Sequence, residues 1–333
     1  VQCLKIDFVV LMLIFAVIIP ATPLIQAHPG GFSFFMEYSK PRLSIDEQIA
    51  LLKKRGLTIK DEDRASRYLS DISYYRLSAY LYYFLQKPKK DHNFSGDASF
   101  DKVLDLYLFD RELRLIIFDL IERVEISIRS QLIYYLSESQ GAWWFENESL
   151  FTKKIWHVRN LNTVDKELKR SNEIFIKHYK ETYSKPERPP SWMTFEVISF
   201  GLLSKIFRNL KMSKEKKEIS KHFDLPSPYI LESWIQSMVY VRNLCAHHSR
   251  LWNRVLTIKP KIPKHTENVF LKNRDIHQEK MYLFMSCGIY LLNSIIPENT
   301  FVERFKELLN KYNFEHLKSM GFPDSWQDEE LLS

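Results

Sequence analysis

Apolar residues recur along most of the chain at the three- and four-residue steps of an amphipathic helix. The clearest stretch covers residues 100–137, which is too long for a strand. Positions separated by these steps lie on one face of a helix, because each turn takes about 3.6 residues. The stretch therefore predicts a long helix whose buried stripe consists of Leu106, Phe109, Leu113, Ile117, Leu120, Val124, Ile128 and Leu132.

Shorter helices are predicted on both sides of this one. The segment Ser44-Ile-Asp-Glu47 has the Ser-x-x-Glu form of a capping box, and Gly56 follows Arg55, so we expect a helix between them. A proline-rich connection covers residues 185–190. Further helical patterns cover residues 61–86, 153–180 (helical or irregular), 192–210, 214–223, 229–254, 275–296 and 301–312. The expected fold class is all-α.

The first residues have a different composition. Residues 8–19 are an apolar run that Pro20 follows, a layout typical of a secretory signal peptide. The run ends before the roughly 20 residues that a membrane-spanning helix needs, so we expect no stable membrane association. We interpret residues 1–35 as an apolar leader, either an upstream start assigned by mistake or a signal-like segment, and residues 36–333 as one all-α domain. The first alternative predicts a cytoplasmic protein, and the second leaves export open.

Composition supports a helical globular protein and is compatible with a polyanionic partner. The chain has 45% hydrophobic residues and only 8 glycines among 333 residues, which disfavours disorder and turn-rich β folds. Its three cysteines, Cys3, Cys245 and Cys287, are too scattered for a disulfide framework or a zinc site, and no metal or cofactor is expected. The net charge of +7 suits a polyanionic partner such as RNA but does not require one, since many basic proteins bind no nucleic acid. Basic residues in 153–180 and 205–221 could form a track for RNA or a solvated helix face.

Candidate chemistry lies in residues 229–254. On the predicted helix, one stripe is apolar and another is polar, comprising Gln236, Tyr240, Asn243, His247, Arg250 and Arg254. Arg242 lies about 140° around the helix from His247, yet its long side chain can bend towards the same face.

These residue types match the needs of RNA cleavage by the RNA's own 2′-hydroxyl. Histidine, with an ordinary pKa of about 6.5, can accept or return a proton at neutral pH. Arginine can bind phosphate oxygens bidentately and stabilise the charge of the transition state. Asn243 could hydrogen-bond the imidazole of His247 and fix its tautomer. The alternative is that Arg242 and His247 are merely ion-paired surface groups.

The chain resembles the abortive-infection (Abi) family of bacterial phage-defence proteins, the AbiD/AbiF-like group, whose core is a HEPN domain. The resemblance covers residues 40–326 and includes the segment Arg242-Asn-Leu-Cys-Ala-His247. Its other motifs, in order, include Ile72-Ser-Tyr-Tyr-Arg-Leu-Ser-Ala-Tyr80, Phe109-Asp-Arg-Glu-Leu113, Ile121-Glu-Arg-Val-Glu125, Ser199-Phe-Gly-Leu-Leu-Ser204 and Met320-Gly-Phe-Pro323.

The resemblance implies a HEPN-like helical bundle with additional helices, and a homodimer in which the Arg-x4-His helices of two subunits form one composite ribonuclease site. Arg242, Asn243 and His247 would be the catalytic set. Auxiliary candidates are Glu122, Glu125, His248 and Arg250. Structural salt bridges with Arg123 or Arg129 explain the two glutamates equally well. For His248, packing or a spare hydrogen-bond donor is a better explanation than a second base. An antitoxin or a regulatory RNA is a further candidate partner.

Two functions follow from these observations. The first is a metal-independent endoribonuclease that leaves a 2′,3′-cyclic phosphate and a 5′-hydroxyl. The second is a non-catalytic HEPN-type module that binds RNA or protein through the same residues. Substitution of His247 by alanine discriminates between them, because it abolishes cleavage in the first case and leaves binding nearly unchanged in the second.

Overall fold

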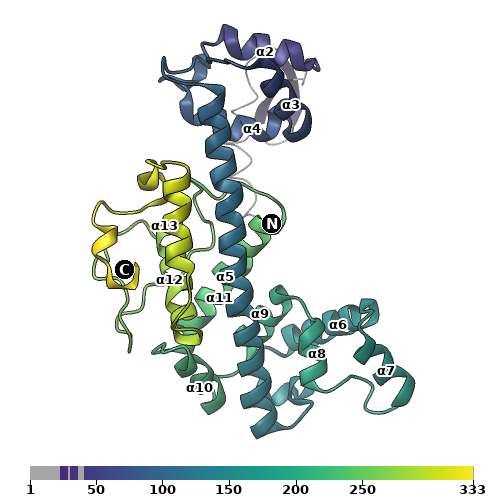
Figure 1. Cartoon of the computed structure of the whole chain (residues 1–333). Helices are drawn as coiled ribbons and strands as arrows, with labels where there is room; N and C mark the ends of the chain where they lie inside the picture. Colours follow the sequence, from purple (N-terminus) through teal and green to yellow (C-terminus); the bar gives the residue numbers. More distant parts are fainter. Residues whose placement is uncertain (1–22, 29–30, 37–40, 333) are drawn as a thin grey trace. The chain divides into compact units, whose positions relative to one another are not determined.

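The computed structural model describes residues 23–28, 31–36 and 41–332. They are mainly helical, which confirms the predicted all-α class (Figure 1). The chain divides into two compact units, residues 1–109 and 110–333. The boundary lies inside one continuous helix, α5 (Phe100–Gln140), so no change of composition marks it in the sequence.

In the first unit, the structure describes a hairpin that covers the end of the segment predicted as a leader, residues 1–35, and also includes Met36. Strands β1 (Pro23–His28) and β2 (Gly31–Met36) pair antiparallel, with Pro23 opposite Met36 and His28 opposite Gly31. This hairpin was not predicted. The apolar run of the leader, residues 8–19, lies outside the described residues. Among the residues that are described, no helix is both long and apolar enough to cross a membrane.

The predicted capping box begins the first described helix, α2 (Ile45–Lys54). The Ser44 hydroxyl accepts a hydrogen bond from the Glu47 amide at 3.2 Å, and the Glu47 carboxylate accepts one from the Ser44 amide at 2.6 Å. Gly56 follows with a φ of 89°, a left-handed conformation that glycine adopts without strain. The sequence prediction is therefore confirmed at both ends of this helix.

The single helix predicted over residues 61–86 is wrong, because Ser73 divides it. The helix α3 (Glu62–Ile72) ends at Ser73, whose φ is 74°, and α4 (Tyr74–Leu81) begins directly after it. The Ser73 hydroxyl accepts a hydrogen bond from the Arg76 amide at 3.4 Å and so caps the second helix. Short 3-10 turns follow at Tyr82–Phe84 and Lys89–Asp91.

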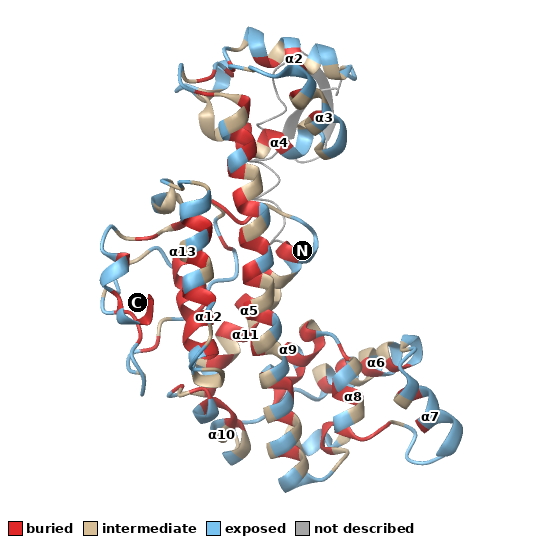
Figure 2. Ribbon diagram, in the orientation of Figure 1, coloured by how far each residue is buried: buried red, intermediate tan, exposed pale blue. Residues whose placement is uncertain are grey.

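The buried stripe predicted for the long helix is confirmed, since each of its eight apolar residues is at most 4% exposed (Figure 2). In the second unit, α5 packs against α12 (Met281–Ile295), nearly all of whose residues are buried. A Cβ added at Gly288 of α12 would lie 2.7 Å from a methyl carbon of Leu120, so the glycine permits the close approach of these two helices.

The remaining helices of the second unit differ from the prediction mainly at their ends. The pattern over residues 153–180 forms two helices, the pattern over 192–210 breaks where Ser199 caps a new helix, and the pattern over 275–296 becomes helical only at Met281. The helices are α6 (Lys154–Arg170), α7 (Ile174–Thr182), α8 (Ser191–Val197), α9 (Phe200–Asn209), α10 (Lys214–His222), α11 (Pro228–Ala246) and α13 (Phe301–Lys311). Short 3-10 turns occur at Trp144–Glu146, Glu148–Leu150, Leu317–Met320, Trp326–Asp328 and Glu330–Leu332.

Candidate functional site

The helix that carries the candidate residues is shorter than predicted. It ends at Ala246, and His247 is its C-cap, so the prediction of a helix over residues 229–254 is wrong. The amide of His248 donates to the Cys245 carbonyl at 3.0 Å, and the amide of Ser249 donates to the Leu244 carbonyl at 2.9 Å. These two bonds form a Schellman motif, which closes a helix.

Because the helix ends there, the predicted polar face does not continue through Arg250 and Arg254. His248 has a φ of 55°, a left-handed conformation that is unusual for histidine. Its place in the Schellman motif gives its backbone a structural function. The residue is exposed, so the packing expected for its side chain is not observed. Arg250 lies beyond the helix and is half-buried, and its carbonyl accepts a hydrogen bond from the Arg254 guanidinium at 3.2 Å.

A buried carboxylate on α5 holds the loop that follows α11. Asp110 is 0% exposed, and its oxygens accept the amides of Leu251 at 3.1 Å and Trp252 at 2.6 Å. The guanidinium of Arg114, one turn along α5, donates to Asp110 at 2.5 Å and to the Ser249 carbonyl at 3.4 Å. The loop after His247 is thereby tied to α5 through main-chain and charged hydrogen bonds.

Arg242 is half-buried on α11, and its guanidinium carbon lies 5.7 Å from the ring centre of Phe118 on α5. This distance is typical of a cation–π contact. Its Nε is buried without a hydrogen-bond partner in the described part of the chain. Neither Arg242 nor His247 forms an ion pair within the described residues, which argues against the alternative that they are paired surface groups.

Asn243 and His247 are both exposed near the end of α11. The hydrogen bond that joins them runs from the His247 amide to the Asn243 carbonyl at 3.0 Å, as in the rest of the helix. The proposed bond between the Asn243 amide and the imidazole is not formed in this structure. His247 lies five residues beyond Arg242, a rise of about 7.5 Å along the helix.

The two glutamates of α5 differ in their surroundings. Glu125 pairs with Arg129 at 2.6 Å, and the same arginine donates to the carbonyls of Phe195 and, at 2.9 Å, Ile198 at the end of α8. Glu125 therefore has the structural function that the sequence analysis weighed as the alternative. Glu122 is exposed on α5, one turn beyond Phe118, and its side chain is accessible to solvent.

Sequence reasoning did not identify Asp110, Arg114 or Phe118 as residues that support the site. A signal was present for the first two, since an acid and a base four residues apart fall beside the buried stripe of the predicted long helix. Charged residues in such positions are rarely buried unless they are paired. Their partners in the loop after α11 are more than a hundred residues away and no spacing indicates them.

The model of one protein family, described as Abi-like protein, matches residues 67–253, which is more than half of the chain. The matched region contains the long helix α5, the loop anchored by Asp110 and the whole of α11. No curated protein and no solved structure matches the chain significantly. The match over this region shows that the chain belongs to the Abi-like protein family.

Proposed function

We propose that this protein is an endoribonuclease of HEPN type that acts in abortive infection. Membership of the Abi-like family suggests involvement in this form of bacterial defence against phages. The observation that carries the enzymatic part of the proposal is the end of α11. An accessible imidazole lies there together with a guanidinium that has no acidic partner among the described residues. Phage and host transcripts are found in the cytoplasm, where we expect the protein to act.

His247 supplies the proton transfer in the proposed reaction. Its side chain is exposed beyond the last turn of α11, so an RNA strand can approach it. The imidazole removes the proton of the 2′-hydroxyl, and the resulting oxygen attacks the adjacent phosphorus. The imidazolium returns this proton to the 5′-oxygen as the bond between phosphorus and that oxygen breaks, which leaves a 2′,3′-cyclic phosphate and a 5′-hydroxyl. Each of these steps uses side chains and the RNA itself.

Arg242 supplies the positive charge that stabilises the transition state. Contact with Phe118 restricts the position of the guanidinium, and no carboxylate of the described residues neutralises it. A fixed cation of this kind stabilises the negative charge that builds on the phosphate oxygens in the transition state. Asn243, exposed on the same helix, can contact the RNA backbone once a strand is bound.

We further propose that two subunits contribute to one site, as the resemblance to HEPN proteins implies. A stripe on α5 runs beside Arg242 and contains the exposed residues Leu115, Glu122 and Ile126 and the half-buried Phe118. Leu115 is 57% exposed and Ile126 is 54% exposed. Apolar side chains exposed beside polar candidates for catalysis are typical of a surface that a partner covers.

The test is cleavage of labelled RNA in excess EDTA by the wild-type protein and by the variants Arg242→Ala and His247→Ala. The expected loss in rate is about 10²- to 10⁴-fold for His247→Ala, because removal of a general acid–base group usually costs this much. For Arg242→Ala it is about 10²- to 10³-fold, which is typical when one group that stabilises the charge of the transition state is removed. His178→Ala is the matched control, since His178 is an exposed histidine on α7. Analysis of the product ends identifies the reaction, because the proposed mechanism leaves a 2′,3′-cyclic phosphate.

Absence of cleavage on every RNA tested, with RNA binding unchanged in both variants, would contradict the enzymatic proposal. That result would favour the non-catalytic binding module. Cleavage that survives in His247→Ala would place the reaction elsewhere in the molecule.

A further inference from the structure

A basic pocket separate from the end of α11 lies between α6 and α9. Its volume is about 320 Å³, within the range of sites for small ligands. Both helices belong to the second unit, and they pack against each other. The pocket is lined by Trp156, Arg159, Asn160, Thr163, Lys205 and Arg208.

The lining favours an anion next to a flat aromatic group. It contains three cationic side chains and no carboxylate. The guanidinium carbon of Arg208 lies 5.4 Å from the ring centre of Trp156, and the Lys153 ammonium lies 4.0 Å from the same ring. An aromatic ring surrounded by cations is the combination with which proteins bind single-stranded nucleic acid, where bases stack and phosphates pair with the cations.

An unpartnered amide within the pocket indicates that a polar ligand belongs there. Asn160 is only 8% exposed, and its Nδ2 has no hydrogen-bond partner in the described structure. A buried donor without a partner destabilises the folded protein. A carbonyl or ring nitrogen of a nucleobase, or a phosphate oxygen, would satisfy it.

Two contacts hold the walls of the pocket in place. Asn209, at the end of α9, accepts a hydrogen bond from the Lys153 amide and donates one to the Lys153 carbonyl, both at 3.0 Å. Near the other end of α6, the Glu167 carboxylate accepts from the Ser199 amide at 2.6 Å and from its hydroxyl at 3.0 Å. The pocket is therefore formed before any ligand binds.

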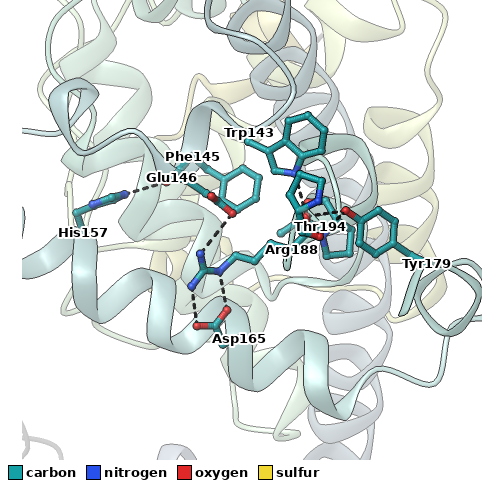
Figure 3. Close-up of polar contacts among 10 residues, drawn as sticks. Trp143, Phe145, Glu146, His157, Asp165, Tyr179, Arg188 and Thr194 are labelled. Carbon is teal, nitrogen blue, oxygen red and sulfur yellow. Dashed lines mark hydrogen bonds and ion pairs between the residues drawn. The ribbon is translucent and has the colours of Figure 1, made fainter. Parts of the chain in front are cut away.

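The opposite face of α6 is held by a separate network (Figure 3). Asp165 lies about 180° around the helix from Trp156, and both of its oxygens accept hydrogen bonds from Arg188, at 2.6 and 2.9 Å. Arg188 also donates to Glu146 at 3.3 Å, and the pKa of its guanidinium is raised, chiefly by the hydrogen bonds to Asp165. Asp165 and Glu146 are thus engaged away from the pocket, whose lining keeps its three cationic side chains.

We propose that this pocket binds one nucleotide of a single-stranded RNA at a point outside the scissile bond. Arg159, Lys205 and Arg208 contact its phosphates, the base lies against Trp156, and the Asn160 amide donates to it. This inference rests on the proposed function, in which the protein acts on RNA. It assigns to α6 and α9 the function of holding the strand, while the end of α11 cuts it.

The test measures binding of a fluorescent 2′-O-methyl oligoribonucleotide, which lacks the attacking hydroxyl and cannot be cleaved through it. The pocket variant carries Arg159→Gln, Lys205→Gln and Arg208→Gln. The control variant carries Lys166→Gln, Lys169→Gln and Lys177→Gln, which removes the same charge from exposed positions of α6 and α7. Titrations are repeated across a series of salt concentrations.

The pocket variant is expected to bind at least tenfold more weakly than the control. The magnitude of the slope of log K against log salt should fall by about 1.4, since two phosphates flank the bound nucleotide and each lost phosphate contact on a single strand contributes about 0.7. A Trp156→Leu variant should lose about tenfold in affinity through lost stacking, whereas Trp156→Tyr should retain most of it. Thermal unfolding of each variant checks that the fold is intact.

Equal losses in the pocket and control variants would overturn the proposal, because only general electrostatic attraction would then remain. Wild-type protein that does not bind the oligonucleotide would overturn it as well. Competition by a free mononucleotide at micromolar concentration would show that the pocket takes nucleotides rather than a strand, and would also refute it. If the wild-type protein cleaves no RNA but the pocket variant binds the oligonucleotide more weakly than the control variant, the nuclease proposal is refuted and the pocket proposal is supported. The two proposals can therefore be distinguished.

Discussion

Asp110 carries a charge in a position that water does not reach, and its oxygens are occupied by Arg114 and by the amides of Leu251 and Trp252. Replacement by asparagine removes the charge and leaves the Arg114 guanidinium buried without its counter-ion. We expect Asp110→Asn to lower the free energy of unfolding by about 3–5 kcal/mol, which is typical when one partner of a buried ion pair is removed. Urea denaturation measures the change.

The control for this variant is Asp97→Asn. Asp97 pairs with Lys102 at 3.0 Å, but both side chains are more than half exposed. Surface pairs contribute about 0–1 kcal/mol. If the two variants were equally stable, the hydrogen bonds of Asp110 would not anchor the loop after α11.

Substitutions of His248 can show whether this residue has only a structural function or also takes part in catalysis beside His247. Its left-handed backbone at the end of α11 suits glycine and disfavours β-branched residues. We expect His248→Gly to be more stable than His248→Val by about 1–2 kcal/mol. Thermal unfolding and RNA cleavage would be measured together. Loss of cleavage in His248→Gly as complete as in His247→Ala would show that the His248 imidazole also takes part in the reaction.

Cys245 lies two residues before His247, yet it is buried, with only 5% of the residue exposed. Burial raises its pKa to about 12 from a value of 9.0. The thiol therefore stays neutral and unreactive in the folded protein, because the thiolate is the nucleophile. At pH 8.5, iodoacetamide should leave the peptide that contains Cys245 unmodified in native protein and modify it in urea, as read by mass spectrometry. Rapid native labelling would mean that this end of α11 opens readily.

At the level of elements, Asn209 joins the end of α9 to the start of α6, where no side chain caps the helix. The variant Asn209→Ala leaves the amide and carbonyl of Lys153 without these partners. We expect faster hydrogen exchange in the first turns of α6, and a loss of about 1–3 kcal/mol in stability. Asn162→Ala, on the exposed surface of α6, should change neither quantity. Equal exchange rates in both variants would show that packing alone fixes α6.

The sequence predicted helices most accurately where local signals determine their ends. The Ser44–Glu47 capping box and Gly56 define α2, and the strict apolar spacing of residues 100–137 defines most of α5. The end of α11 was missed because His248, rather than glycine, occupies the left-handed position. The contact of the following loop with Asp110 stabilises that end. Because Asp110 is distant in sequence, local helix propensity does not indicate this contact.

At the level of the whole molecule, the sequence indicated the residue types of the candidate site but not their surroundings. Arg242, Asn243 and His247 follow from one short segment, since they lie within a single helix and its cap. The contact of Arg242 with Phe118 and the pocket between α6 and α9 depend on packing between separate helices. The basic stretches were visible in the sequence, but only the fold brings Arg159 next to Lys205 and Arg208.

The proposed dimer makes a prediction for the whole assembly. The exposed stripe of α5 beside Arg242 would be buried between subunits, so Leu115→Lys together with Ile126→Lys should introduce charges that a dry interface does not tolerate. We expect the variant to sediment as a monomer and to lose RNA cleavage while it unfolds at nearly the same temperature as the wild type. Both positions are already exposed in the single chain, which is why the fold should persist.

Ile174→Lys provides the matched control, because Ile174 on α7 is 84% exposed and lies on a different helix from the proposed interface. It should leave both the sedimentation behaviour and the cleavage rate unchanged. A wild-type protein that sediments as a monomer at every concentration and still cleaves RNA would contradict the composite site. Arg242 and His247 of one chain would then have to complete the reaction without a partner subunit, and the apolar residues of the α5 stripe would need another explanation.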